Sequence, residues 1–461
     1  MNSSPERNRR QCSPAGAKQA GDNPRETGTP AIATGLSRLN GVERSVWTDC
    51  MLDALERGVK GGKWFSLFDK VHDRKTLLVA YNRVATNNGA AGVDNVSVKR
   101  FGSNLECELN KLQEELRLRN YNPRPVKRVQ IPKPGKKETR PLGIPTVRDR
   151  VVQTALRMVI EPIFEAEFAE HSYGFRPGRG CKDALGRVCE LLKSDHNFVV
   201  DADIKSYFDS IPHDRLMARL EEKISDGQIL SLLRSYMEAE ILDDAKQWTP
   251  DQGTPQGAVI SPLLANIYLN PLDHLMAQEG FEMIRYADDF VILCSTKEDA
   301  QEALGIVTGW MENEQLTLHP EKTRLLEVTE KEGFDFLGYH FRKKGTLKRR
   351  WVTRKKVKLF REKLKPLTKR TNGNSMETII KKINPMLRGW YEYFKHSHPN
   401  VLESIDGWVR GRLRGILRKR RKLRGRGRGE DHIRWKNDFF HALGLFSQLQ
   451  AQRRELQSAL R

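Results

Sequence analysis

Two adjacent acidic residues between two β-prone runs constrain this chain more than any other feature. Residues 286–289 read YADD and separate the runs at 281–285 and 290–294. Short runs rich in β-branched and aromatic residues on both sides of a turn predict a β-hairpin. Because adjacent carboxylates repel each other, such a pair is best tolerated beside a divalent cation. The pair therefore predicts a metal site at a hairpin tip or, as the simpler alternative, an ordinary acidic turn.

A second acidic segment offers the partner that a two-metal site needs. Two divalent ions about 3.5–4 Å apart can stabilise both the attacking and the leaving oxygen of a phosphoryl transfer. Their ligands have to come from separate elements of a rigid sheet. Asp201 and Asp203 lie in and after an apolar strand predicted at 198–204. Alternate residues of a strand share one face, so spacing alone leaves both acids as candidates.

The positive charge of the chain is concentrated at one end. The 461 residues include 80 Lys and Arg against 59 Asp and Glu, a formal net charge of +21. Residues 342–461 hold 35 basic and 9 acidic residues (+26), which leaves 45 and 50 (−5) for residues 1–341. A segment with this excess carries more charge than solubility requires. It predicts a polyanionic partner, of which nucleic acid is the commonest.

Length and composition exclude several classes of protein. The chain is longer than one hydrophobic core supports, so we expect two to four units. No run approaches the ~20 apolar residues of a membrane span, and the N-terminus lacks the apolar region of a secretory signal. The six cysteines form no Cys-x-x-Cys pair, which argues against a zinc site or a disulfide scaffold. A reducing cytoplasm is the expected compartment.

The remaining pattern predicts helices and short strands around these features. Residues 1–45, rich in Ser, Pro, Gly and Arg, predict a disordered or loosely ordered extension. Apolar periodicity and turn residues predict the other elements. Helices are expected within 46–101 on either side of a loop at 86–94, then at 103–119, 149–169, 258–278, 298–315 and 435–460. Strands are expected in a basic hairpin over 126–145, at 198–204, in the acidic hairpin over 281–295, and at 334–341.

Six motifs in one order resemble those of reverse transcriptases. They are RPLGIP at 140–145 and SYGFRPGRG at 172–180 for the fingers, ADIKSYFD at 202–209, GTPQGAVISPLLANI at 253–267 and YADD at 286–289 for the palm, and LGY at 337–339 for the primer-gripping segment. In the first palm motif the acid at the position of Asp203 is catalytic. Six motifs in family order are far more specific than any one of them.

Two further segments narrow the resemblance to the reverse transcriptases encoded by group II introns. INPMLRGWYEYF at 383–394 resembles the signature of their thumb-like maturase domain, and NGAAGVD at 88–94 resembles their extra N-terminal block. The resemblance covers roughly residues 50–445. Family members often carry a C-terminal metal-binding nuclease, but no paired Cys/His pattern follows residue 400. We therefore expect no endonuclease domain.

The resemblance implies an α+β fold of the right-hand polymerase type. Fingers and a palm with an antiparallel sheet would be followed by an α-helical thumb or maturase domain. The expected parts are the extension at 1–45, an N-terminal extension and fingers at 46–185, the palm at 186–341, and the basic helical thumb/maturase domain, with its RNA- and DNA-binding tail, at 342–461.

The resemblance also implies roles for individual residues at the polymerase centre. Asp203, Asp288 and Asp289 would be catalytic and would hold two Mg²⁺ ions. The implied nucleotide-binding residues are Lys133, Arg140, Phe208, Gln256, Gly257 and Lys322. Lys133 and Arg140 would neutralise the triphosphate, with Lys136 or Lys137 as alternatives to Lys133. The ring of Phe208 would exclude a 2′-hydroxyl, or would simply be a core aromatic.

The other nucleotide contacts are expected at the template and at the leaving group. Gln256 and Gly257 would border the templating base pair, and glycine permits a close approach of the backbone. Lys322 would act near the leaving pyrophosphate, unless it is an ordinary surface lysine. Contacts to RNA are expected from seven basic residues, Arg176, Arg179, Arg388, Arg418, Lys419, Arg420 and Arg421.

The implied activity is RNA-directed DNA synthesis from dNTPs on an RNA template, here intron RNA, with a DNA or RNA primer. A maturase would also assist intron splicing and mobility. No membrane is expected as a partner, and a bacterial-type enzyme would associate with the nucleoid when it acts on DNA. Two alternatives remain open: a host-adopted reverse transcriptase in DNA repair or phage defence, and an RNA-binding splicing factor with dispensable polymerase activity. The presence of all three acids favours a live polymerase centre.

Overall fold

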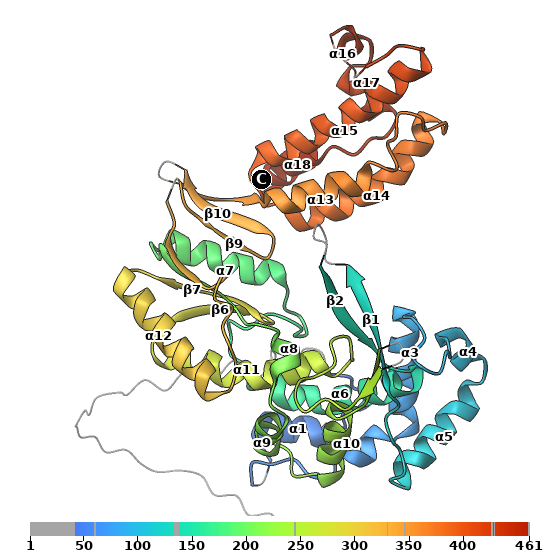
Figure 1. Cartoon of the computed structure of the whole chain (residues 1–461), viewed down its shortest axis with the longest axis vertical. Coiled ribbons are helices and arrows are strands. Elements are labelled where there is room, and N and C mark those ends of the chain that lie inside the picture. The colour runs from blue at the N-terminus through green and yellow to red at the C-terminus, as the bar shows by residue number, and fades with distance from the viewer. Residues whose placement is uncertain are drawn as a thin grey trace, which may run out of the picture.

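The structure, a computed structural model, describes residues 42–59, 61–132, 138–243, 246–329, 331–344, 347–425, 427 and 429–459. The extension expected at 1–45 therefore lies almost wholly outside the described residues, and so do Lys133, Lys136 and Lys137. The described chain forms a lower helical part, a central sheet and an upper helical part (Figure 1). Among the described residues, no helix combines the length and the apolar character that crossing a bilayer requires.

The lower part combines helices with a small sheet. Its helices are α1 (Asp49–Arg57), α2 (Phe68–Val71), α3 (Arg74–Asn87), α4 (Val98–Ser103), α5 (Leu105–Arg117), α6 (Val147–Glu165), α9 (His213–Glu221) and α10 (Gly227–Met237). The sheet has the order β2-β1-β4-β5, from β1 (Val126–Pro132), β2 (Thr139–Ile144), β4 (Ile241–Asp243) and β5 (Lys246–Trp248). Strands β1 and β2 pair antiparallel, which confirms the basic hairpin predicted at 126–145.

The central sheet confirms the acidic hairpin. Its order is β6-β7-β3-β8, all antiparallel, from β3 (Phe198–Asp203), β6 (Glu282–Tyr286), β7 (Asp289–Cys294) and β8 (Arg324–Glu327). It lies between α11 (Ser261–Gln278) and α12 (Lys297–Asn313) on one side and α7 (Cys181–Lys193) on the other. Both faces are covered, because Phe290 and Ile292 join the core of α11 and α12 while Val291 and Leu293 join the core of α7.

The chain next forms a second antiparallel sheet of order β11-β10-β9, from β9 (Phe334–Phe336), β10 (Tyr339–Lys344) and β11 (Leu347–Val352). The single strand predicted at 334–341 is wrong in one respect, because two antiparallel strands occupy this range. It bends back on itself at Leu337 and Gly338, whose φ angles of 49° and 84° are left-handed. This bend makes the LGY motif a turn and the start of β10 instead of the middle of a strand.

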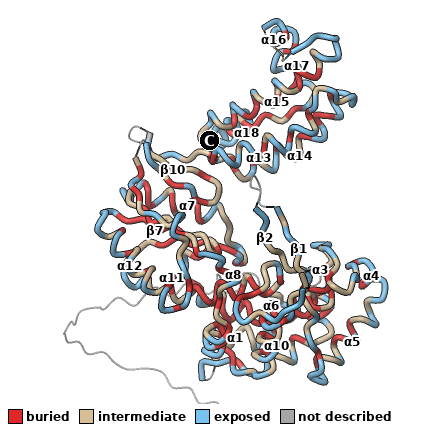
Figure 2. The backbone as a smooth tube through the Cα atoms, viewed as in Figure 1, coloured by how far each residue is buried: buried red, intermediate tan, exposed pale blue. Residues whose placement is uncertain are grey.

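The upper part is helical and has a core of its own. It comprises α13 (Arg354–Leu364), α14 (Met376–Phe394), α15 (Pro399–Arg420), α16 (Glu430–Arg434), α17 (Asn437–Ala442) and α18 (Gln448–Ala459). The continuous helix predicted at 435–460 is wrong. The chain breaks between α17 and α18, where Gly444 has a φ of 83° and Leu445 N–H donates to the Phe440 carbonyl. Figure 2 shows buried inner faces and exposed outer faces on these helices.

Candidate active site

Strand register brings two of the predicted acids together. Asp203 ends β3, Asp289 begins β7, and the two are directly opposite each other in the antiparallel pair. Directly opposed residues of such a pair have their Cβ atoms about 4.5–5.5 Å apart. Asp288 lies in the turn that joins β6 to β7, next to Ala287, whose φ of 60° is left-handed. The three carboxylates therefore gather at one end of the central sheet.

Burial and mutual repulsion oppose ionisation of these acids. Burial, reinforced by the charges of Asp201, Asp288 and Asp203, raises the pKa of Asp289 to about 7. Burial and the neighbouring Asp203 also raise the pKa of Asp288. Such crowding is the situation that a cation would relieve, and carboxylate oxygens are the ligands that Mg²⁺ prefers.

Basic side chains from the segment after α12 face the acids of β3. The Lys322 ammonium, on a side chain that is 54% exposed, forms an ion pair with Asp203. Arg324 forms one with Asp201 at 3.1 Å. Asp201 is opposite Val291, two residues further from the tip, so the register favours Asp203 over Asp201 as the partner of Asp289.

The described carboxylates do not form a ready-made ion cage. In the described part of the chain, no group of three or more His, Cys, Asp and Glu side chains is close enough together to hold a metal ion as it stands. The donor chemistry nevertheless suits Mg²⁺, since every candidate ligand is an oxygen. In this structure the ammonium of Lys322 contacts Asp203, one of the carboxylates that would bind the ion.

A loop before α11 contacts two separate segments of the chain. Thr254 N–H donates to the Phe208 carbonyl at 2.6 Å, and Gly143 N–H donates to the Gln256 carbonyl at 2.6 Å. Gly257 has a φ of 109°, and a Cβ there would lie 2.4 Å from the Gly143 carbonyl oxygen. Glycine is therefore required where the loop passes over β2. The predicted residues Gln256 and Gly257 thus adjoin strand β2 and the short helix α8 (Tyr207–Ser210).

The two other described nucleotide candidates lie on elements that this loop connects. Phe208 is half-buried, with its ring 5.6 Å from that of Tyr207 in an edge-on arrangement. Tyr207 is buried and donates to the Ala265 carbonyl at 2.6 Å, which anchors α8 to α11. Arg140 is exposed on β2, opposite Ile131.

The structure contradicts the RNA contact predicted for Arg176. Its side chain is only 3% exposed and forms an ion pair with Glu165 at 2.8 Å. Its guanidinium also donates to the Ser172 carbonyl at 2.8 Å and to that of Ala169. A group that is buried and engaged in this way cannot contact RNA, so we assign Arg176 a structural role in place of the predicted RNA contact.

The other predicted RNA contacts are more accessible. Arg179 is half-buried over the Tyr173 ring, and Arg388 is exposed on α14, 4.5 Å from the Phe446 ring centroid. The last four end α15 or follow it: Arg418 is tied to Asp431 at 2.6 Å, whereas Lys419, Arg420 and Arg421 are exposed.

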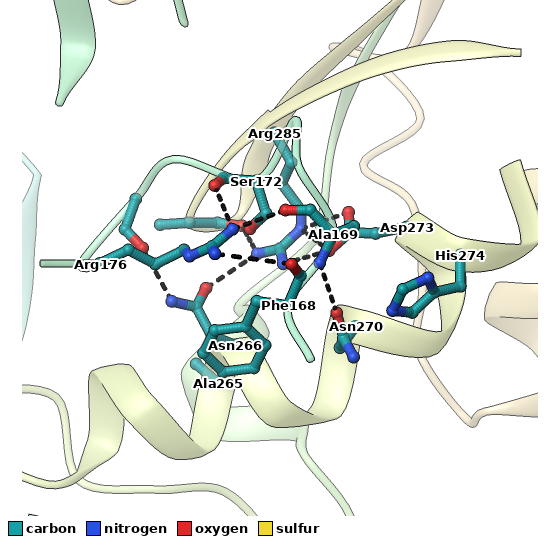
Figure 3. A network of polar contacts seen from close by, with 12 residues as sticks. Phe168, Ala169, Ser172, Arg176, Ala265, Asn266, Asn270, Asp273, His274 and Arg285 are labelled. Carbon is teal, nitrogen blue, oxygen red and sulfur yellow. Dashed lines mark hydrogen bonds and ion pairs between the residues drawn. The ribbon is translucent and has the colours of Figure 1, made fainter. Parts of the chain in front are cut away.

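Sequence reasoning missed a buried polar network behind the acidic turn. Arg285 on β6 contacts Asp273 and Asn266 on α11, as Figure 3 shows. Arg285 precedes the YADD motif directly, but nothing in the spacing identified its partners. An arginine in an otherwise β-prone run, which needs a partner if buried, was the available signal.

Comparison with known proteins identifies the family of this chain. A family model described as reverse transcriptase (RNA-dependent DNA polymerase) matches residues 131–341, and one described as group II intron, maturase-specific domain, matches residues 357–434. Protein YkfC of Escherichia coli is 34% identical over 296 residues, which cover 55% of this chain and 76% of YkfC. The chain belongs to the group II intron reverse transcriptase and maturase family.

Two further similarities are more partial. The group II intron-encoded protein LtrA of Lactococcus lactis is 38% identical over 202 residues, 43% of this chain and 33% of LtrA. Among solved structures, a partial Cas6-RT-Cas1–Cas2 complex shares 24% identity at a TM-score of 0.36, covering 54% of this chain and 41% of that one.

Membership makes the chain an RNA-directed DNA polymerase, a nucleotidyltransferase with a maturase domain. All six motifs identified in the sequence lie within the first match, and the segment at 383–394 lies within the second. Reverse transcriptases act on an RNA template and in general depend on a divalent metal. The family and the right-hand fold class predicted from the sequence are therefore confirmed.

Proposed function

We propose that Asp203, Asp288 and Asp289 form the centre at which this reverse transcriptase extends a primer 3′-hydroxyl with dNTPs on an RNA template. The observation that carries the proposal is the register of β3 and β7, which sets Asp203 opposite Asp289 beside the Asp288 turn. The position of any one of these acids in the chain does not identify the centre, but the sheet brings all three to one end.

Two Mg²⁺ ions held by these three carboxylates would stabilise charge on the attacking and leaving oxygens. The residues of the chain supply the rest of the arrangement. The sheet holds the carboxylates at a fixed separation, while Lys322 neutralises Asp203 and has to swing away when that carboxylate serves as a ligand. Because the Lys322 side chain is more than half exposed, this movement meets little steric resistance.

The neighbouring residues would select and orient the nucleotide. Arg140, together with Lys133 at the hairpin tip outside the described residues, would bind the triphosphate. Phe208, half-buried beside Tyr207, would lie beneath the sugar and leave no room for a 2′-hydroxyl. Gln256 and Gly257 would border the templating pair, and a displaced Lys322 would be free to act near the pyrophosphate.

The upper helical part would hold intron RNA and assist its splicing. The match of residues 357–434 to the maturase-specific domain favours this second role, as does the similarity to LtrA, whose name describes a group II intron-encoded protein. The expected RNA contacts are Arg179, Arg388, Arg418, Lys419, Arg420 and Arg421. The parts at 46–185, 186–341 and 342–461 would act as fingers, palm and thumb.

Primer extension on matched RNA and DNA templates with Mg²⁺ tests the proposal. Asp288→Ala should abolish synthesis while leaving RNA affinity within about twofold of wild type, since the basic residues are untouched. Asp53→Ala, at an exposed acid of α1, is the matched control and should extend primers normally. Substantial synthesis by Asp288→Ala would refute the assignment of the centre.

A further inference from the structure

Arg285 is fully buried directly before the acidic turn, and its guanidinium reaches two different elements. On one side Nε donates to Asp273 Oδ1 at 2.8 Å, and Nη2 contacts the same carboxylate. On the other side Nη1 is 2.9 Å from Asn266 Oδ1 and 3.0 Å from the Ala287 carbonyl oxygen. Figure 3 shows the guanidinium between helix α11 and the hairpin. One side chain thus links α11 to the backbone of the YADD turn.

The turn that Arg285 contacts has a disfavoured conformation. Ala287 has a φ of 60°, and a left-handed backbone is costly for a residue with a Cβ. The carbonyl of this residue is the one that accepts from Arg285. Residues held in such conformations persist when their surroundings over-determine them, and they cluster at functional sites. The guanidinium is therefore placed to stabilise the conformation from which Asp288 and Asp289 project.

A third segment closes around the same turn. Asn266 Nδ2 donates to the Gly174 carbonyl at 2.7 Å. A Cβ on Gly174 would lie only 2.3 Å from the Ala287 nitrogen, so the backbone of this loop abuts the turn. The loop also pairs with β6, because Tyr173 N–H donates to the Arg285 carbonyl at 2.9 Å. Segments from three of the sequence motifs therefore meet behind the candidate catalytic carboxylates.

The charges explain why this network differs from ordinary packing. The side chains of Arg285 and Asp273 are 0% and 4% exposed, so each charge depends on the other. A buried ion pair is weak support for stability, because apolar residues of similar volume often replace one without loss. The contribution of this arginine is geometric. Its planar fork of donors serves Asp273, Asn266 and a carbonyl at once.

We propose that Arg285 is a positioning residue of the polymerase centre, holding the Ala287 carbonyl so that Asp288 and Asp289 face Asp203. Asp273 and Asn266 in turn orient the guanidinium. The inference rests on the proposed function of the three carboxylates. It assigns a role in the reaction to a residue that touches neither substrate nor metal.

Arg285→Lys tests the proposal, because lysine keeps the positive charge beside Asp273 but cannot reach all three partners. We expect folding and RNA affinity close to wild type. The kcat for primer extension should fall by about thirtyfold, within the range typical of residues that orient metal ligands. The affinity for Mn²⁺, measured on the protein by electron paramagnetic resonance without turnover, should fall several-fold. A purely structural role would change the melting temperature and neither of these two quantities.

Two further variants make the test decisive. Asn266→Ala leaves the ion pair intact and should cause smaller losses in kcat and Mn²⁺ affinity, which keeps the test valid if Arg285→Lys fails to fold. Arg148→Lys, at an arginine paired with Glu115 outside the palm, is the control and should change neither. Wild-type kcat and Mn²⁺ affinity in both palm variants would overturn the inference. If Asp288→Ala is inactive in that case, the proposed function stands and only the role of Arg285 fails.

Discussion

The central sheet and the upper helices handle charge in opposite ways. At the end of the sheet, three carboxylates depend on one strand register and lie among buried residues. Residues 342–461, which include strand β11 and helices α13 to α18, carry a net charge of +26. A slip of one residue in β3 would turn Asp203 to the other face. Moving one arginine along α15 would leave the net charge unchanged. The function of the sheet therefore depends on the exact positions of its carboxylates, whereas that of the upper helices depends on their total positive charge.

The largest expected difference is between the two acids of β3, when each is replaced in turn by asparagine. Asp203→Asn should lower primer extension by on the order of a thousandfold, equivalent to ~4 kcal/mol of barrier. Asp201→Asn should lower it less than about tenfold, because that carboxylate is opposite Val291 and paired with Arg324. Single-turnover rates at saturating RNA measure both effects. Equal losses would mean that strand register does not select the catalytic acid.

Sequence reasoning anticipated the elements whose patterns are local. The hairpin around YADD and the buried helix before it were predicted almost to their ends, since their signals are runs of apolar or β-prone residues. Asp201 and Asp203 could not be separated, because alternation places both on one face and only the partner strand distinguishes them.

Burial was the property that the sequence concealed. Arg176 lies in a motif of basic residues and resembled an RNA contact, but Glu165, eleven residues earlier, holds it inside the protein. Arg285 was overlooked for the same reason, since its partner Asp273 comes from α11. Pairing of this kind depends on tertiary packing, which has no periodic signal in the chain.

A second test concerns the precision of the backbone near the sheet. Gly257→Ala should lower extension by up to about a hundredfold, because the new Cβ would lie 2.4 Å from the Gly143 carbonyl oxygen and displace the loop. Gly280→Ala is matched in backbone, with a φ of 81°, but has nothing within 4 Å of the new Cβ. It should cost about 1 kcal/mol of stability without loss of activity. Equal activity of the two variants would contradict the requirement at Gly257.

A third test measures how far the crowded carboxylates lower the stability of the folded protein. The pKa of Asp289 is about 7 in the folded protein against the ordinary value of 3.8, so folding binds protons between these values and stability rises as pH falls. Without metal, Asp289→Asn should raise the melting temperature at pH 8 by a few degrees, roughly 2 °C or more. The gain should shrink below pH 7 and vanish near pH 4. Thermal scans across this range check the sign, and a gain that grows on acidification would contradict it.

The smallest expected effect lies in the upper helices, where charge acts as a sum. The double variant Lys419→Ala/Arg421→Ala removes two exposed charges and keeps Arg418, whose bond to Asp431 anchors the end of α15. RNA affinity should fall by about threefold to tenfold, and the salt dependence should flatten by roughly 0.7 per lost phosphate contact. The kcat at saturating RNA should not change. Arg57→Ala, at the end of α1, removes one exposed charge elsewhere and should alter neither quantity. If the double variant instead lowered kcat at full RNA occupancy, the basic helices would contribute to the chemistry as well as to binding, and the division between precise and summed charge would fail.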